Sequence, residues 1–217
     1  MTPEFAKMID PIFLEVFELM DRIDRGEHVD FEAAHRSLAQ QLHEVTIAGQ
    51  AAMFQAYDWN DAVYAITCWV DEILASGCEW DGAQWWMDHP LEKDERLFRT
   101  RGGNSIFYEK AAESRSEDAM ESFYVSAMLG FRGLYSTDND VNRRLRQELH
   151  LAETQELWVD DLRQRIHRLR QSEQAGAASA ELYEITVATP LRSWPFVILP
   201  WVFVPILLGL MLVFGRL

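Results

Sequence analysis

One stretch near the C-terminus, Trp194–Phe214, contains 21 consecutive residues without a charged side chain, and the sequence has no second stretch of this kind. As a helix it would be about 31 Å long at about 1.5 Å per residue, close to the roughly 30 Å thickness of the hydrocarbon core of a bilayer. The sequence therefore predicts one transmembrane helix at residues 194–214, preceded by a soluble domain of about 190 residues.

The predicted anchor begins with Trp194 and contains a proline at every fifth residue, at Pro195, Pro200 and Pro205. Tryptophan favours the membrane interface, and proline is tolerated in a membrane helix when neighbouring helices satisfy the freed carbonyls. We therefore expect a kinked first half that packs against another membrane helix. This packing would allow a homodimer through the transmembrane segment.

The residues outside the anchor indicate which side of the membrane holds the bulk of the chain. Arg192 and Arg216 flank the anchor evenly, so the flanking charges do not decide the orientation. Residues 1–10 lack the basic and apolar regions of an export signal. We expect residues 1–171 to form a cytoplasmic domain, 172–193 a juxtamembrane linker, 194–214 the anchor and 215–217 a periplasmic tail.

The formal charge of the chain is −15, and most of the acidic excess lies in the first half. Residues 1–99 carry 20 acidic and 7 basic side chains, a net of −13, whereas residues 100–194 carry 15 and 12, a net of −3. This distribution argues against nucleic-acid binding, which depends on Lys and Arg neutralising phosphates. The six histidines and two cysteines do not show metal-ligand spacing, so we expect no metal and no cofactor.

One segment, residues 162–170, reverses the acidic trend with four arginines and no acidic residue. Two interpretations are open. The arginines could contact anionic membrane lipid beside the anchor, or they could lie on a solvated helix face near a helix C-terminus, where cations are favoured.

Apolar residues recur at helical spacing along most of the soluble part, whereas alternating strand patterns are scarce. We therefore predict an all-α fold, with a single domain of about seven to eight helices that could form two packed lobes. An Ala-, Ser- and Gly-rich linker is predicted at 171–180. Pro11 is expected to kink or break the first helix, and Asp30 to cap the second. The expected helices cover residues 3–26, 31–57, 58–76, 91–98 and 105–113, a central helix from about 118 to 129, and helices around 141–149 and 157–169.

The predicted helix at 58–76 carries its apolar side chains in one sector and its carboxylates on the other side, at about 100° per residue. We expect an exposed acidic surface formed by Asp58, Asp61, Asp71 and Glu72. Asp71 and Glu72 point about 100° apart, which favours a broad surface over a catalytic pair. The alternative is a face that is merely solvated.

Three tryptophans, Trp80, Trp85 and Trp86, occur within a segment predicted as a loop, residues 78–87. Because indole rings are costly to expose, they either cover an edge of the bundle or form an aromatic interface for a partner.

Several of these segments together carry a resemblance to a known family. They are Tyr64-Ala-Ile-Thr-Cys-Trp-Val-Asp-Glu72, Leu97-Phe98 with Gly102-Gly103, Phe107-Tyr108, and Phe123-Tyr124 followed by Leu129-Gly-Phe-Arg-Gly-Leu-Tyr135. With the terminal anchor, the chain resembles the DotU/TssL family, also called IcmH, of bacterial inner-membrane components of type VI and type IVB secretion systems. The motif residues that carry the resemblance are Tyr64, Gly102, Gly103, Leu129, Gly130, Phe131, Gly133 and Tyr135. The chain departs from the family pattern at Gly103-Asn-Ser-Ile, where relatives commonly have Gly-Gly-Glu-Lys, and at Trp69, which replaces a smaller residue.

The resemblance implies a cytoplasmic helical domain with two bundle-like lobes, a complex with an IcmF/TssM-type inner-membrane protein, and docking of the cytoplasmic baseplate. It also implies that Asp71 and Glu72 belong to an acidic cleft used for partner binding.

Three hypotheses for function follow. The first, favoured by the resemblance, is a non-enzymatic scaffold of a secretion-system membrane complex, which we expect to be of type VI. The second is a tail-anchored adaptor or holdase that captures apolar client segments with the tryptophan segment. The third is a membrane-tethered hydrolase that uses Asp58, Asp61, Asp71 and Glu72, although the sequence supplies no second catalytic motif for it.

Overall fold

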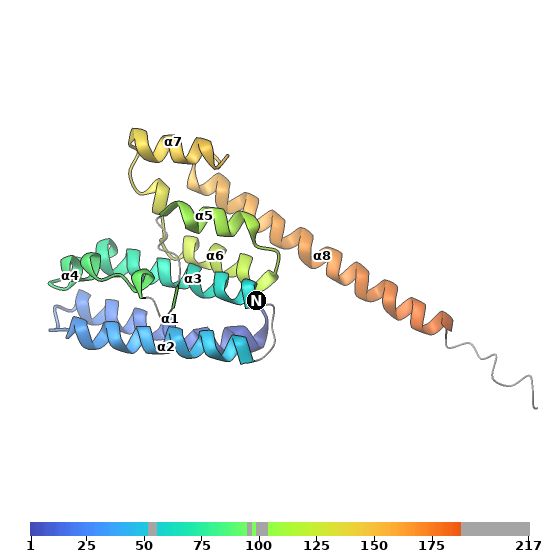
Figure 1. Ribbon diagram of the computed structural model, residues 1–217, viewed down its shortest axis with the longest axis horizontal. Coiled ribbons are helices and arrows are strands. Elements are labelled where there is room, and N and C mark those ends of the chain that lie inside the picture. The colour runs from blue at the N-terminus through green and yellow to red at the C-terminus, as the bar shows by residue number, and fades with distance from the viewer. Residues whose placement is uncertain (52–55, 95–96, 99–103, 188–217) are drawn as a thin grey trace, which may run out of the picture. The chain divides into compact units, whose positions relative to one another are not determined.

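The computed structural model describes residues 1–51, 56–94, 97–98 and 104–187, and the side chains of all these except 50–51, 56–58 and 176–187. The described residues form eight α-helices and three short helical turns, with no strand among them (Figure 1). The predicted all-α class is therefore confirmed. In chain order the elements are α1 (Pro3–Asp24), α2 (Phe31–Ala51), α3 (Ala56–Glu72), the π-helical turn η1 (Ile73–Gly77), α4 (Ala83–Asp88), the 3-10 turn η2 (Leu91–Lys93), α5 (Asn104–Glu113), α6 (Glu117–Met128), the 3-10 turn η3 (Gly133–Tyr135), α7 (Asp140–Glu148) and α8 (Gln155–Val187).

The first two helices begin where the sequence supplies a cap. The Thr2 hydroxyl accepts a hydrogen bond from the Phe5 amide, and the Asp30 carboxylate accepts one from the Ala33 amide. Pro11 does not split α1, since it lies on the exposed side, where water can reach the carbonyl that proline leaves unbonded. The predicted end of the second helix near Tyr57 is wrong, because α2 ends at Ala51 and Tyr57 belongs to α3.

Helix α3 is the centre of the domain. It packs against α2, α5, α6 and η2, and every residue from Ala62 to Asp71 is buried. The predicted exposed acidic face is therefore wrong for this stretch. α6, which we expected to be central, is instead the main partner of α3.

Small residues allow α6 to approach α3 closely. Ala65 is fully buried, and the hydroxyl of the buried Ser126 on α6 donates a hydrogen bond to the Ala65 carbonyl at 3.1 Å. Ser122, one turn earlier on α6, is also fully buried. Because these side chains are short, α6 can cover the side of α3 that carries Ala65, and this side lies inside the protein.

The segment after α3 differs from the prediction in two places. The short helix α4, Ala83–Asp88, begins within the segment predicted as a loop, residues 78–87. Of the predicted helix 91–98, the described residues form only the turn η2 at Leu91–Lys93, and Asp94 after it has an extended backbone with ψ of 112°.

A single hydrophobic core runs through the domain and takes buried residues from α1, α2, α3, α4, α5, α6 and α8. The chain divides into two compact units, Met1–Arg170 and Gln171–Leu217, and this core belongs to the first. The described residues of the first unit therefore share one core and do not divide into two separately packed lobes.

Residues 171–180, predicted as a linker, are helical and belong to α8. Four alanines in this stretch explain the difference, because alanine has the highest helix propensity. Among the described residues, no helix combines the length and the apolar character that a bilayer crossing requires. The predicted anchor, with Trp194, Pro195, Pro200 and Pro205, lies outside the described residues.

The close contact between α3 and α6 makes a testable prediction. Ala65→Leu adds a side chain where there is no room, so we expect the free energy of unfolding to fall by about 1–3 kcal/mol. Ala33→Leu, at an exposed position of α2, is the matched control and should change stability little. Urea unfolding of the detergent-solubilised chain, followed by circular dichroism, measures both, and equal unfolding midpoints for the two variants would contradict the packing.

Candidate functional site

Asp71 lies near the C-terminal end of α3, and its carboxylate accepts three hydrogen bonds. The donors are the Trp86 indole at 2.9 Å, the Leu91 amide at 2.8 Å and the Glu92 amide at 2.9 Å. The two amides belong to the first residues of η2, whose preceding residue, Pro90, supplies no side-chain cap. Asp71 therefore caps the N-terminus of η2 from another helix.

Glu72, the last residue of α3, does the same for a second turn. Its two carboxylate oxygens accept hydrogen bonds from the Arg132 amide at 2.7 Å and the Gly133 amide at 2.8 Å, at the start of η3. The side chain of Arg132 makes no cap of its own for that turn. The adjacent carboxylates thus point to two segments about 40 residues apart in sequence.

Burial dominates the electrostatics of both carboxylates. It raises the pKa of Asp71 to about 7, against the opposing effect of the three donated hydrogen bonds. It also raises the pKa of Glu72, again opposed by its backbone donors. Anions are further disfavoured at a helix C-terminus, so these hydrogen bonds compensate for an unfavourable location.

The turn that Glu72 holds, residues 129–135, contains the strongest motif of the sequence. Gly130 and Gly133 have positive φ angles of 112° and 50°, which favour glycine. A Cβ at Gly133 would also lie 2.9 Å from the Phe131 ring. Phe131 is buried, with its ring centroid 4.0 Å from that of Phe107.

The carbonyls of the same turn are bound by side chains from all sides. The Trp69 indole donates to the Leu129 carbonyl at 3.2 Å, and the Gln155 amide to the Phe131 carbonyl at 2.5 Å. The Tyr108 hydroxyl donates to the Arg132 carbonyl at 2.6 Å. The Arg146 guanidinium binds the Leu134 carbonyl at 2.7 Å. The turn is therefore a fixed part of the surface.

Tyr135 completes this cluster, since its hydroxyl donates to the Ala152 carbonyl at 2.8 Å and thereby ties η3 to the segment before α8. Tyr64 plays a matching part at η2, where its hydroxyl donates to the Glu92 carboxylate at 2.5 Å. Burial raises the pKa of Tyr64 well above its usual range. Both tyrosines therefore act as neutral hydrogen-bond donors.

The three predicted acidic residues whose side chains are described, Asp61, Asp71 and Glu72, do not form one exposed surface. Asp71 is buried, Glu72 is partly buried, and Asp61 forms an ion pair with Lys110 of α5. The Lys110 ammonium also lies 5.4 Å from the centroid of the Tyr64 ring. The side chain of Asp58 lies outside the described residues, as do Gly102 and Gly103.

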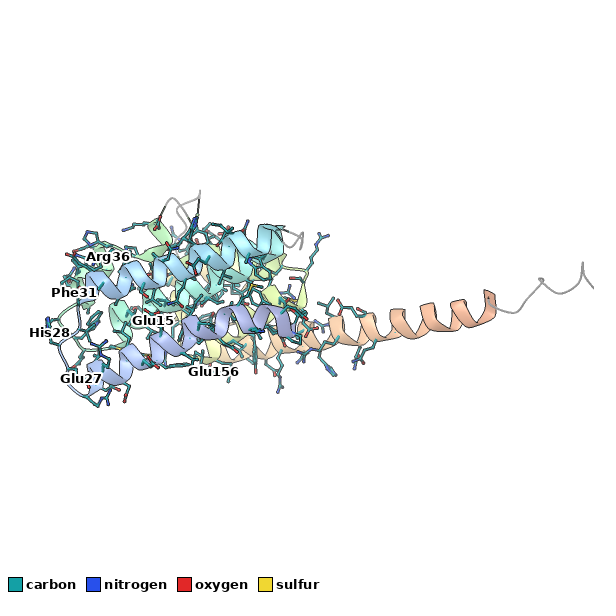
Figure 2. All side chains as sticks on the ribbon, turned by 90° about the horizontal axis from the view of Figure 1, so that it is seen from below. Glu15, Glu27, His28, Phe31, Arg36 and Glu156 are labelled. Carbon is teal, nitrogen blue, oxygen red and sulfur yellow. The ribbon has the colours of Figure 1, made fainter. Side chains whose placement is uncertain are left out.

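The three tryptophans pack against the start of α2 rather than standing free. Trp86 is fully buried, while Trp80 and Trp85 are half-buried against Phe31, with ring centroids 6.4 and 5.2 Å away. Figure 2 shows this end of the domain, with Phe31 labelled. The Trp80 indole donates to the Leu74 carbonyl. Trp80 and Trp85 keep part of their surface accessible.

Two of the four arginines at 162–170 have structural roles. Arg165 binds the carbonyls of Ala111, Ala112 and Ser114 at the end of α5, where a cation also suits the helix dipole. Arg170 pairs with Glu117 and Glu121 of α6. Arg163 pairs with Asp160 of its own helix, and Arg168 is exposed.

The described part of the chain contains no group of three or more His, Cys, Asp or Glu residues placed to hold a metal ion. Asp71 and Glu72 are committed to separate backbone segments, so they do not converge on one substrate position. This arrangement suits shape maintenance better than acid–base chemistry, which needs groups that converge in a cleft.

Sequence reasoning missed the buried location of Asp71, although two signals pointed to it. Ala65 and Cys68 lie between the carboxylates of α3, and such small residues favour close packing. Trp69 and Val70 precede Asp71, and Ile73 and Leu74 follow Glu72, which places the pair inside an apolar run. No local sequence signal pointed to the hydrogen bonds that Gln155 and Arg146 donate to the 129–135 turn, because each bond joins segments distant in sequence.

Comparison with known families identifies the chain. A family model described as type VI secretion system protein DotU matches residues 5–216. The chain belongs to the DotU family. Membership makes it a component of a type VI secretion system, and it confirms the resemblance drawn from the motifs. No significant match was found among curated proteins, and none among solved structures.

Asp71 should give the stability of this DotU family member a distinctive pH dependence. Its pKa is about 7 in the folded state and near the ordinary 3.8 in the unfolded chain. Between these values the folded state holds a proton that the unfolded state has released, so the free energy of unfolding should fall as pH rises from 4 to 7. The contribution of Asp71 to the free energy of unfolding should fall by at most about 1.4 kcal/mol per pH unit in this window, and it should be constant below and above it.

Asp71→Asn removes this titration while other acidic groups remain. The unfolding free energy of the wild type minus that of Asp71→Asn, measured by urea unfolding from pH 4 to pH 8, should therefore fall as pH rises. A difference that stays constant or rises with pH would contradict a raised pKa of Asp71 in the folded state.

Glu72 should stabilise the fold through the 129–135 turn. Glu72→Ala leaves the amides of Arg132 and Gly133 without their acceptor, so we expect a loss of about 1–3 kcal/mol in unfolding free energy. Glu79→Ala, at an exposed position in the loop after α3, removes the same charge and should have little effect. Equal losses in the two variants would show that charge alone, and not the cap, matters.

Proposed function

We propose that the chain is a non-enzymatic scaffold of the type VI inner-membrane complex, which links an IcmF/TssM-type membrane protein to the cytoplasmic baseplate. Family membership supports the secretion-system part of this proposal. The observation that carries the scaffold part is the use of the motif residues. Asp71, Glu72, Gly133 and Tyr135 are all engaged in holding surface turns in place.

The proposal includes a membrane anchor at residues 194–214, with the bulk of the chain on the cytoplasmic side of the inner membrane. Its support is the length and apolar character of this segment, which fit the hydrocarbon core of a bilayer. Pairing of two copies through the anchor, and contact between anchor and lipid, belong to the same proposal.

Partner docking on the acidic first half is the second element of the proposal. The net charge of −13 in residues 1–99 would attract partners that carry arginine or lysine and would speed their association. Asp61, at 18% side-chain exposure, and Asp58 are the proposed direct contacts on α3. Asp71 and Glu72 would act on docking by positioning η2 and η3, and Trp80 and Trp85 supply an aromatic contact beside the start of α2.

Co-purification tests this function. Tagged full-length chain, solubilised from cells that express the whole secretion system, should recover both the IcmF/TssM-type protein and baseplate components. Asp61→Asn should lower recovery of the cytoplasmic components severalfold, because it removes one charge from the proposed docking surface. Glu148→Gln, which removes a charge from an exposed acid of α7 outside residues 1–99, should leave recovery unchanged.

Failure of the wild-type chain to recover either class of component, at normal abundance in the membrane fraction, would overturn the scaffold function. Unchanged recovery with Asp61→Asn would remove only the proposed contact at Asp61.

A further inference from the structure

We infer that a groove between α6 and the first part of α8 binds an acidic amphipathic helix of a partner protein. The groove consists of two adjoining depressions of about 440 and 630 Å³, which share Tyr124 and Arg163. It lies within the first unit of the chain and is distinct from the acidic face proposed above, so it does not depend on that proposal.

The two walls of the groove have helical spacing. On α6 the lining residues Ala127 and Met128 follow Tyr124 by three and four positions. On α8 the lining extends from Gln155 through Val159 and Arg163 to Arg170, a length of about 22 Å at 1.5 Å per residue. Two parallel rows of this kind match the ridges of a third helix of about four turns.

The floor of the groove offers apolar surface to such a helix. Met128 is 60% exposed, which is unusual for a large apolar side chain, and the half-buried Tyr124 and Val159 lie along the same groove. A helix with apolar residues at every third or fourth position would cover these side chains.

Charge selects the partner. The α8 wall carries Arg163, at 67% exposure, and the exposed Arg168, whereas the chain as a whole has a charge of −15. The pair that Arg163 forms with Asp160 is exposed, and exposed pairs are weak, so a partner carboxylate can compete for the guanidinium. A partner with acidic residues beside its apolar face would therefore bind here.

The carboxylates of the groove favour a protein over a membrane surface. Glu121, Glu156 and Asp160 line the groove together with the arginines, and a layer of anionic lipid headgroups would be repelled by all three. A helix can instead place its own residues to match a mixed pattern of charges. Figure 2 labels Glu156, which marks the end of the groove at the start of α8.

The arrangement of the neighbouring turn supports a preformed site. Arg132, which also lines the groove, belongs to the 129–135 turn, whose backbone is held by Glu72, Tyr108 and Gln155. A rigid rim reduces the entropy lost on binding.

The test uses the full-length chain in detergent and two fluorescent 16-residue helical peptides. Both peptides carry leucine at every third and fourth position, and their flanking residues are glutamate in one and lysine in the other. Fluorescence anisotropy should show binding of the glutamate peptide at least tenfold tighter than that of the lysine peptide. The double variant Arg163→Glu with Arg168→Glu should reverse this preference, and Met128→Asp should weaken both peptides.

Arg144→Glu, at an exposed arginine of α7 outside the groove, is the matched control and should keep the wild-type preference. Equal binding of the two peptides, or binding unaffected by the groove variants, would overturn the inference. Self-association of the chain that Met128→Asp abolishes would assign the groove to a second copy and also overturn it. Neither peptide result depends on recovery of secretion components, so failure here is separable from failure of the scaffold function.

Discussion

The fold depends on two neighbouring carboxylates at the C-terminal end of α3 that cap turns belonging to other parts of the chain. Asp71 and Glu72 together accept hydrogen bonds from five N–H groups, four of them backbone amides at the starts of η2 and η3. Neither turn has a side-chain cap of its own. The central helix thereby determines where two surface segments lie, and an unpaired amide at either place would be costly.

This arrangement gives the acidic pair, which is part of the segment that carries the family resemblance, a structural role as a cap for two turns. A carboxylate at a helix C-terminus is electrostatically unfavourable, and burial adds to that cost. The hydrogen bonds that their oxygens accept offset this cost. The remaining motif residues follow the same logic, since Gly133 makes room for Phe131 and Tyr135 ties the turn to the segment before α8.

Much of the helical pattern could be predicted from the sequence, because local signals specify it. Thr2 and Asp30 cap their helices, and the apolar residues of α1 recur at helical spacing. Predictions failed where tertiary contacts outweighed local signals. The buried side of α3 was mistaken for a surface because Asp71 is polar, yet its partners Trp86, Leu91 and Glu92 lie 15 to 21 residues away. At 171–180 the failure was different, since alanine propensity outweighed the glycine and serine that favoured a linker.

Charge is distributed unevenly along the chain, since residues 1–99 carry a net charge of −13, whereas residues 162–170 carry four arginines and no acidic residue. In the proposed scaffold, such differences would let complementary charge steer each partner to its own face. The capped turns keep the groove rim in place while the helices supply the charged rows.

Hydrogen exchange of individual backbone amides tests the central claim most directly. With Glu72→Ala, the amides of Arg132 and Gly133 should lose protection while those of Leu91 and Glu92 keep it, and Asp71→Ala should give the opposite pattern. Unchanged protection at all four amides, or an equal loss at both turns in each variant, would contradict the account.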